Sequence, residues 1–220
     1  MNPHGYFYAR QCGTGLMLAI SLLAQGAQAQ TAPLPAWNSN YWGASLGFAT
    51  NGTDRVALAP LGVTPGNLVL AGTDYALQAG FLRQNATLVW GLEADLHLGQ
   101  IDSKITDGTY TATSTINRSA SLRLRAGLPV QDGLLYLTGG VMLAALDYSV
   151  SGGGVAIADN STRAGFVVGA GYEWALRQGW SVRGEYQYAN FGRETLSDGV
   201  NSTEATPDFH ALRLGFNHRF

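Results

Sequence analysis

In residues 87–99, with the sequence TLVWGLEADLHLG, every second residue from Leu88 is apolar, and from Gly91 onward the residues between them are glycine or polar. A period of two is typical of a β-strand with one apolar and one polar face. In a water-soluble protein the apolar face lies in the core, whereas in a membrane-spanning barrel the apolar face meets lipid and the polar face lines the interior. The carboxylates of Glu93 and Asp95 therefore mark either the outer or the inner surface, and the rest of the chain decides between them.

The first 29 residues have the pattern of a secretory signal peptide. Arg10 precedes the apolar run LMLAISLLA, and the small-residue motif AQA ends at Ala29. The alternative, a transmembrane helix, needs about 20 apolar residues, and this run is shorter. We expect cleavage after Ala29 and a periplasmic linker over residues 30–39. Cys12, the only cysteine, is then removed with the signal.

The composition restricts the class of protein. Charged residues make up 13% of the chain, whereas a water-soluble surface normally carries about 25–35%. Glycine is abundant, with 29 residues, and Lys104 is the only lysine. The formal net charge is −2 and no basic run occurs, so nucleic acid is not an expected partner. This composition indicates one domain, over residues 40–220, whose exterior partly avoids water.

Seven further segments alternate in the same way as residues 87–99. Together the eight segments are residues 41–49, 75–82, 87–99, 116–128, 134–145, 163–174, 180–191 and 210–220. In 134–145 both faces are apolar, so its phase stays open. A length of about ten residues suits a tilted strand that crosses a bilayer. The pattern predicts an all-β fold, an eight-stranded antiparallel transmembrane up-and-down β-barrel.

The connections between these segments alternate in length. Residues 83–86, 129–133 and 177–179 are short, whereas 51–74, 101–115, 149–162 and 192–209 are long and polar. Short periplasmic turns and long extracellular loops are typical of bacterial outer-membrane barrels. A soluble eight-stranded barrel of the lipocalin type is the alternative, and its loop lengths alternate less regularly. The long segments are therefore expected to be loops outside the cell.

Charged residues share one face of the predicted strands with glycines, and the other face is almost free of charge. An arginine on the lipid face costs about 2–4 kcal/mol at mid-depth, so the charged face is expected to line the interior. The carboxylates in 87–99 then point inward. The expected interior charge network consists of Glu93, Asp95, Arg123, Arg125, Glu173, Arg183, Glu185 and Arg213.

The spacing of these charges also predicts a register. Antiparallel neighbours keep a constant sum of residue numbers. Sums centred on the short turn at Gln178, and near residues 108 and 199 in two of the long connections, place unlike charges opposite each other. The predicted pairs are Glu173 with Arg183, Glu93 with Arg123, and Glu185 with Arg213. A shift by two residues preserves the faces, so this alternative stays open.

The ordered set of segments resembles a known family. The stretches that carry the resemblance are YWGASLGFA, LQAGF, LVWGLEADL, SLRLRAGLP, LLYLTGGVMLA, FVVGAGYEWAL, WSVRGEYQYANFG and ALRLGFNHRF. They are similar to the small porin-like, opacity-protein-type outer-membrane barrels of Gram-negative bacteria, the eight-stranded surface antigens. The resemblance implies export to the outer membrane. It also implies a C-terminal signal for the barrel-assembly machinery at Leu212, Leu214, Phe216 and Phe220.

Residues that suggest chemistry have simpler interpretations. Glu93 and Asp95 allow an acid/base pair in principle, but side chains fill the interior of an eight-stranded barrel. His97 cannot share a metal with His210 or His218 without refolding, so no metal site is expected. The stretch SGGGVA, residues 151–156, lacks the lysine and helix of a phosphate loop and is expected to be a flexible external loop.

We therefore expect a non-enzymatic envelope protein with a side-chain-filled interior and four surface loops, and without a cofactor. The expected partners are outer-membrane lipid and lipopolysaccharide, the barrel-assembly machinery and periplasmic chaperones, and the sequence does not identify a loop ligand. Two alternatives stay open: a small passive pore or uptake barrel, and a barrel enzyme that acts on lipid.

Overall fold

The structure is a computed structural model that describes residues 37–59, 63–197, 202–205 and 207–220. The predicted signal peptide and most of the predicted linker lie outside the described residues. Within the described part no helix is long and apolar enough to cross a membrane.

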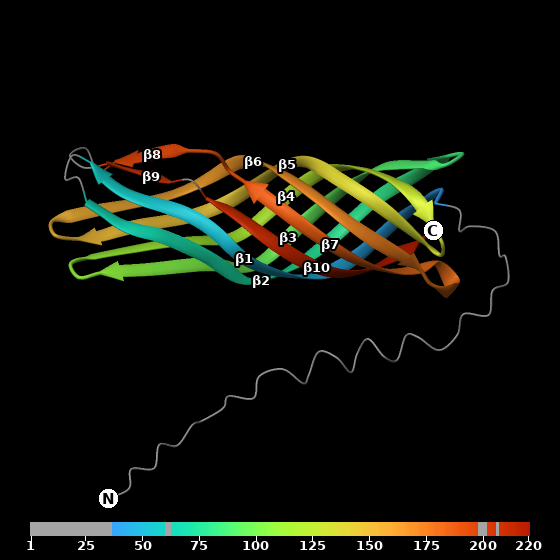
Figure 1. Cartoon of the computed structure of the whole chain (residues 1–220), viewed down its shortest axis with the longest axis horizontal. Helices are drawn as coiled ribbons and strands as arrows, with labels where there is room; N and C mark the ends of the chain where they lie inside the picture. The colour runs from blue at the N-terminus through green and yellow to red at the C-terminus, as the bar shows by residue number, and fades with distance from the viewer. Residues whose placement is uncertain (1–36, 60–62, 198–201, 206) are drawn as a thin grey trace, which may run out of the picture. The chain divides into compact units, whose positions relative to one another are not determined.

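Eight strands form the wall of a barrel (Figure 1). They are β1 (Ser39–Ala59), β2 (Val63–Asn85), β3 (Leu88–Asp107), β4 (Tyr110–Val130), β5 (Gly133–Gly152), β6 (Val155–Ala175), β7 (Trp180–Asn190) and β10 (Asp208–Arg219). Two short strands, β8 (Glu194–Ser197) and β9 (Ser202–Ala205), pair with each other, and β9 also pairs with the end of β1.

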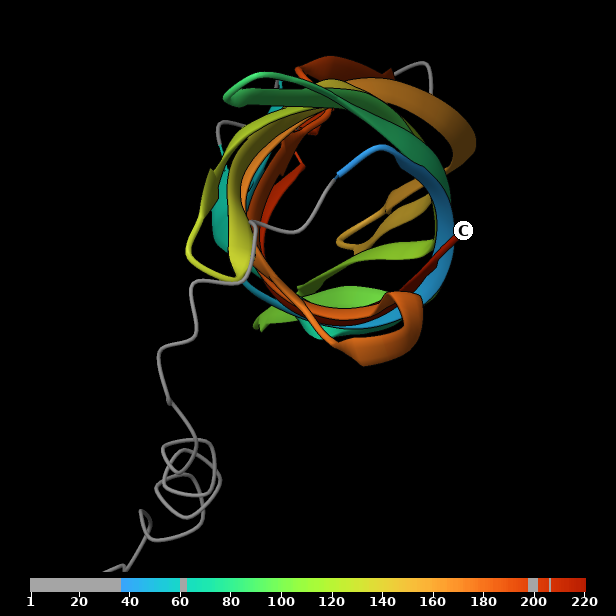
Figure 2. The ribbon, with the colours of Figure 1, turned by 90° about the vertical axis from the view of Figure 1, so that its right-hand side faces the viewer.

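The sheet closes on itself because β10 pairs antiparallel with β1 (Figure 2). Tyr41 lies opposite Arg219, and two backbone hydrogen bonds between Asn40 and Phe220, at 3.0 and 2.9 Å, complete the seam. Closure matters in lipid, where an unpaired backbone group has no water to bind. The predicted eight-stranded antiparallel barrel is confirmed.

The short connections lie at the end of the barrel that also carries the C-terminus (Figure 1). The turn residues Ala86, Gln131 and Gln178 have positive φ angles of 49°, 53° and 59°, which allow the chain to reverse within few residues. A three-residue 3-10 helix, η2 (Arg177–Gly179), makes the last of these turns. The predicted short connections are confirmed.

The prediction of long loops is wrong for most of their length, because the strands continue as paired hairpins at the other end of the barrel. β3 and β4 pair from Val89 to Asp107, and β5 and β6 pair along their whole length. Threonine and isoleucine recur in 101–116, and such β-branched residues favour extended backbone. The buried side chains of Ala112, Tyr148, Val150, Val155 and Ile157 pack inside these hairpins.

The stretch SGGGVA is a tight hairpin turn, which corrects its interpretation as a flexible loop. Gly153 and Gly154 have φ angles of 57° and 85°, a region that suits glycine. The β3–β4 hairpin turns in the same way at Gly108, with φ at 52°. Glycine at these positions therefore ends the hairpins sharply.

Burial alternates along the membrane-spanning parts of the strands where side chains are described, as the sequence predicted. In β3, Gly91, Glu93 and Asp95 are buried, whereas Trp90 and Leu96 are exposed. The structure also resolves the phase of β5, where the even-numbered residues from Leu134 to Leu146 point inward, with partly buried Gly140 among them. The strands therefore enclose an interior that differs in chemistry from the outer face.

Interior side chains form layers along the barrel. Near the short turns, an apolar cluster contains Trp37, Tyr41, Leu82, Val89, Leu134 and Tyr136. A second cluster towards the hairpins includes Ile101, Met142, Phe191 and Phe209. Trp37 belongs to the segment predicted as a linker, yet it is completely buried and its backbone N–H donates to Gln84 Oε1 at 3.0 Å. The described end of that segment is therefore part of the barrel.

Candidate functional site

The eight charged residues that the sequence placed inside the barrel are all buried. Glu93, Arg123 and Arg183 have no exposed surface, and the other five are at most 4% exposed. Each lies on the inward-facing phase of its strand, because alternation places every second side chain inside. β3, β4, β6, β7 and β10 contribute them.

Arg123 on β4 binds three carboxylates. Its Nε donates to Asp95 Oδ2 at 2.9 Å and its Nη2 donates to Asp95 Oδ1 at 3.0 Å. The same guanidinium also binds Glu93 on β3 and Glu185 on β7. Such multiple charge-assisted bonds compensate a buried cation for the water it has lost.

Arg125 lies one step further towards the short turns. Its Nη2 donates to Glu173 Oε2 at 2.7 Å, and its Nη1 donates to the Tyr41 hydroxyl oxygen at 3.2 Å. The guanidinium lies 3.9 Å from the centre of the Tyr136 ring, in cation–π geometry. Arg183, in turn, binds Glu93. The charges thus form one connected cluster rather than separate pairs.

The predicted register is confirmed at all three positions, because Glu173 lies opposite Arg183, Glu93 opposite Arg123, and Arg213 opposite Glu185. Only the second of these pairs forms an ion pair in the structure. The expectation that direct strand neighbours bind each other is wrong for the other two.

Glu173 illustrates the reason. It binds Arg125 and accepts hydrogen bonds from Ser181 Oγ at 2.5 Å and Asn217 Nδ2 at 2.9 Å. Interior side chains in a narrow barrel point towards its axis, so a long arginine reaches residues two or three strands away.

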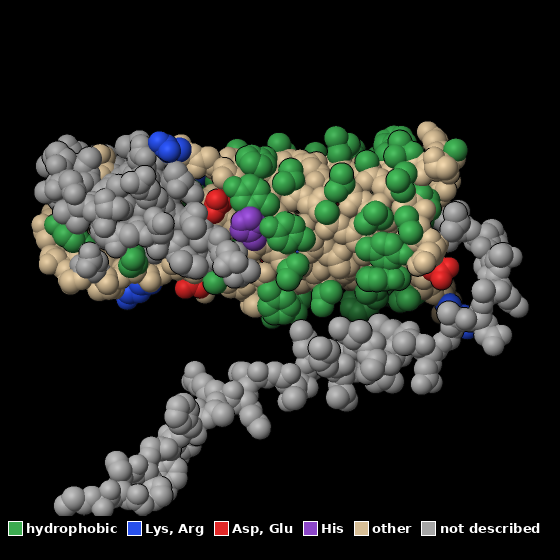
Figure 3. Space-filling view, viewed as in Figure 1, with side chains coloured by type: hydrophobic (Ala, Val, Ile, Leu, Met, Phe, Trp, Pro, Cys, Tyr) green, Lys and Arg blue, Asp and Glu red, His purple; other side chains and the backbone are tan. Residues whose placement is uncertain are grey.

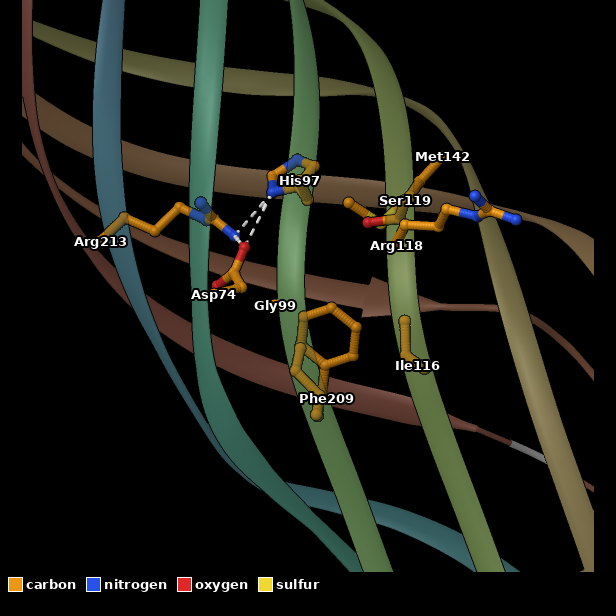
Figure 4. Close-up of a pocket in the computed structure, with 10 residues that line it drawn as sticks. Asp74, His97, Gly99, Ile116, Arg118, Ser119, Met142, Phe209 and Arg213 are labelled. Atoms are coloured by element: carbon orange, nitrogen blue, oxygen red, sulfur yellow. Dashed lines mark hydrogen bonds and ion pairs between the residues drawn. The ribbon is translucent and has the colours of Figure 1, made fainter.

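A second polar group lies beside the apolar cluster that contains Ile101, Met142, Phe191 and Phe209. Asp74 on β2 accepts a hydrogen bond from His97 Nδ1 at 3.0 Å, and Arg213 binds the same carboxylate (Figure 4). A cavity of about 10 Å³ adjoins these side chains, which is the space of one water molecule. The sequence pattern assigns Asp74 to the connection 51–74 and does not single it out. Asp74 continues the inward-facing alternation of Ala76 and Gln78 by one more step, and this alternation is the signal that could have identified it.

The outer face of the barrel is apolar over a continuous band. Figure 3 shows hydrophobic side chains gathered over the part of the wall nearer the short turns, with charged side chains at its borders. Exposed tryptophans lie near the short turns, at Trp42, Trp90, Trp174 and Trp180. Exposed aromatic residues at the other border are Phe48, Tyr75, Phe166 and Tyr186. Two aromatic girdles that flank an apolar band are typical of outer-membrane barrels.

Comparison with known proteins agrees with this geometry. The family described as outer membrane protein beta-barrel domain matches residues 15–220. A curated relative, the 31 kDa outer-membrane immunogenic protein of Brucella melitensis biotype 1, is 26% identical over 239 residues, covering 96% of each chain.

Two solved structures share the fold at low sequence identity. The outer membrane protein OprG from Pseudomonas aeruginosa has a TM-score of 0.58 and 11% identity, covering 85% of this chain and 97% of its own. The outer membrane protease OmpT from Escherichia coli has a TM-score of 0.52 and 9% identity, covering 84% and 97%. The closed barrel, its apolar band and the match over residues 15–220 together show that this chain belongs to the outer membrane protein beta-barrel domain family and is located in the outer membrane.

Proposed function

We propose that this protein is a non-enzymatic component of the outer membrane whose interior is closed by its own side chains. The observation that carries the proposal is the Arg123 cluster. Arg123 connects two carboxylates on β3 with one on β7, across the interior, and none of the three partners is more than 4% exposed. Bonds that cross the interior leave little room for a solute path and brace the wall mechanically.

The four long hairpins are then the parts presented at the cell surface. Their position opposite the short turns supports this orientation, because outer-membrane barrels carry their longer connections outside. The Brucella relative is described as immunogenic, and exposed hairpins offer surfaces for recognition. Lipopolysaccharide is the expected neighbour of the hairpin end.

Assembly requires partners as well. Leu212, Leu214 and Phe216 are exposed on the last strand, and exposed Phe220 follows directly after it. This C-terminal pattern supports recognition by the barrel-assembly machinery after delivery by periplasmic chaperones. The predicted signal peptide, with its expected cleavage after Ala29, supports the export step.

A catalytic role is the contrasting hypothesis, since OmpT is a protease with a similar fold. A similarity of 9% identity concerns the fold alone. The histidine–aspartate pair of this chain, His97 and Asp74, is 3% and 4% exposed, which favours a structural role. The burial of these polar groups therefore favours a role in stabilising the barrel over a role in catalysis.

Deletion of the gene in its native bacterium tests the envelope role. We expect increased leakage of a periplasmic marker enzyme and greater sensitivity to detergent, both restored by the wild-type gene. Restoration by a variant that carries Glu93→Ala and Arg123→Ala, at equal surface amounts, would contradict the contribution of the interior cluster.

A further inference from the structure

Arg118 is a cation on the membrane-facing side of the wall, near the hairpin end. Arg118 on β4 is exposed and shares the outward phase with Ala120, Leu122 and Leu124. Figure 4 shows its side chain directed away from Asp74, His97 and Arg213. From Ala120 to Val130 the outward positions of β4 carry no charge, so Arg118 marks the border of the apolar band at the hairpin end.

A β-bulge adjoins Arg118. The pairing of β4 with β5 shifts by one residue between Ile116 and Arg118, so that Asn117 and Arg118 are both exposed. Bulges are typically retained where a side chain must be redirected. Here the bulge turns Asn117 outward, and its Nδ2 donates to Asp147.

The nearby carboxylate is thereby occupied by amides. Asp147 Oδ2 accepts the hydrogen bond from Asn117. Asp147 Oδ1 accepts a second one, at 3.0 Å, from the side-chain nitrogen of Asn160 in the amide orientation that matches donors with acceptors. Among the described residues, the Arg118 guanidinium has no hydrogen bond or ion pair. An arginine at an interface without an acidic partner has its five N–H donors available for a ligand.

A groove of about 180 Å³, lined in part by Arg118, lies on the outer surface. Leu96, Ala120, Leu143 and Ala145 give it apolar walls and a floor of small side chains. Ala145 is the strand neighbour of Arg118 on one side and of Thr162 on the other. A cation and a hydroxyl therefore flank the groove at the level where the apolar band ends.

We propose that this groove binds lipid A of the outer leaflet, with one phosphate at Arg118 and Thr162 and an acyl chain along Leu96, Ala120 and Leu143. The planar guanidinium suits bidentate contact with phosphate, and a cation at the membrane border suits an anionic lipid headgroup. The inference rests on the proposed function in one respect, the orientation that places the hairpin end in the outer leaflet.

Native mass spectrometry of the full-length, detergent-purified barrel tests the site with defined lipids. Lipid A with both phosphates is titrated against the wild type and Arg118→Gln. We expect Arg118→Gln to bind about tenfold more weakly, because it loses one charged hydrogen-bonding contact with the phosphate. Dephosphorylated lipid A is expected to bind both proteins equally.

The matched control is Arg83→Gln, which removes an exposed arginine from β2 near the short turns. It is expected to bind lipid A as the wild type does. Ala145→Leu keeps the charge of Arg118 but fills the groove, so it should weaken binding of the phosphorylated lipid. It serves as the test variant if Arg118→Gln does not fold.

Three results would overturn the site: wild-type affinity in Arg118→Gln or Ala145→Leu, an equal loss in Arg83→Gln, or displacement of the lipid by millimolar inorganic phosphate, which would indicate a site for the free anion. The assay uses purified protein and does not depend on barrel orientation. Failure of the orientation itself would instead appear in intact cells, as reversed accessibility of the two ends.

Discussion

Arg123 and Glu185 are 62 positions apart in the chain, on β4 and β7, and they bind each other inside the barrel. β5 and β6 separate the two strands in the sheet, so the bond does not follow the strand ladder. Glu185 also accepts a hydrogen bond from the Tyr136 hydroxyl at 2.6 Å. The interior of this barrel is therefore held together by contacts across its axis as well as by neighbouring strands.

The first prediction concerns the partner of Glu173. Removal of one member of a buried ion pair costs about 3–5 kcal/mol, so Glu173→Gln and Arg125→Met should each destabilise the barrel clearly. A double-mutant cycle on urea unfolding in lipid vesicles should give a coupling of about 0.5–3 kcal/mol between Glu173 and Arg125. The coupling with Arg183, its strand neighbour, should be smaller. The reverse order would show that ladder position decides the pairing.

Strand alternation predicted which side chains point inward, because each step along a strand reverses the face. The register was also predicted, because few antiparallel pairings place unlike inward-facing charges opposite each other. The partners of Glu173 and Arg213 could not be predicted, because the reach of an arginine across the interior depends on barrel width and on neighbouring side chains. The Asn117 bulge was equally hidden, as one inserted residue in a polar stretch leaves no periodic signal.

The length of the strands also could not be predicted from the alternation of apolar and polar residues. Segments 101–115 and 149–162 lack the contrast between an apolar and a polar face that marks the membrane-spanning part. Backbone pairing nevertheless continues through them, because an antiparallel ladder propagates until a turn such as Gly153–Gly154 reverses the chain. Hairpin length is therefore decided by the turn and not by amphipathicity.

A second prediction tests which surface meets lipid. Leu124 is 62% exposed in the centre of the apolar band, and Leu124→Arg should cost about 2–4 kcal/mol in lipid vesicles. Ala156→Arg places the same charge on an exposed position of the β5–β6 hairpin and should leave the unfolding free energy nearly unchanged. Equal effects of the two substitutions would contradict the assignment of the band.

A third prediction concerns the closed end near the short turns. Trp37 is completely buried, and the Arg219 guanidinium lies 4.4 Å from the centre of its ring. Trp37→Ala should destabilise the barrel by about 3–5 kcal/mol, through lost burial and the cavity left behind, as measured by urea unfolding. Trp42→Ala, at an exposed aromatic on the outer face, should cost less. A smaller loss for Trp37→Ala than for Trp42→Ala would place residue 37 outside the folded unit.

The fourth prediction concerns topology in the cell. A short epitope inserted at Gly153, in the tip of the β5–β6 hairpin, should be tolerated and accessible to antibody on intact cells. The same epitope at Gln178, in the short turn before β7, should be hidden or should block assembly. Labelling at Gln178 but not at Gly153 would invert the proposed orientation.

The central claim is that side chains close the interior, and single-channel recording in planar bilayers tests it most directly. The wild-type barrel should insert without stable conductance steps, because Arg123 and its carboxylate partners span the cross-section. A variant with Glu93→Ala, Arg123→Ala and Glu185→Ala, once shown to fold, should conduct more than the wild type. Reproducible open-channel steps from the wild-type protein would contradict the account.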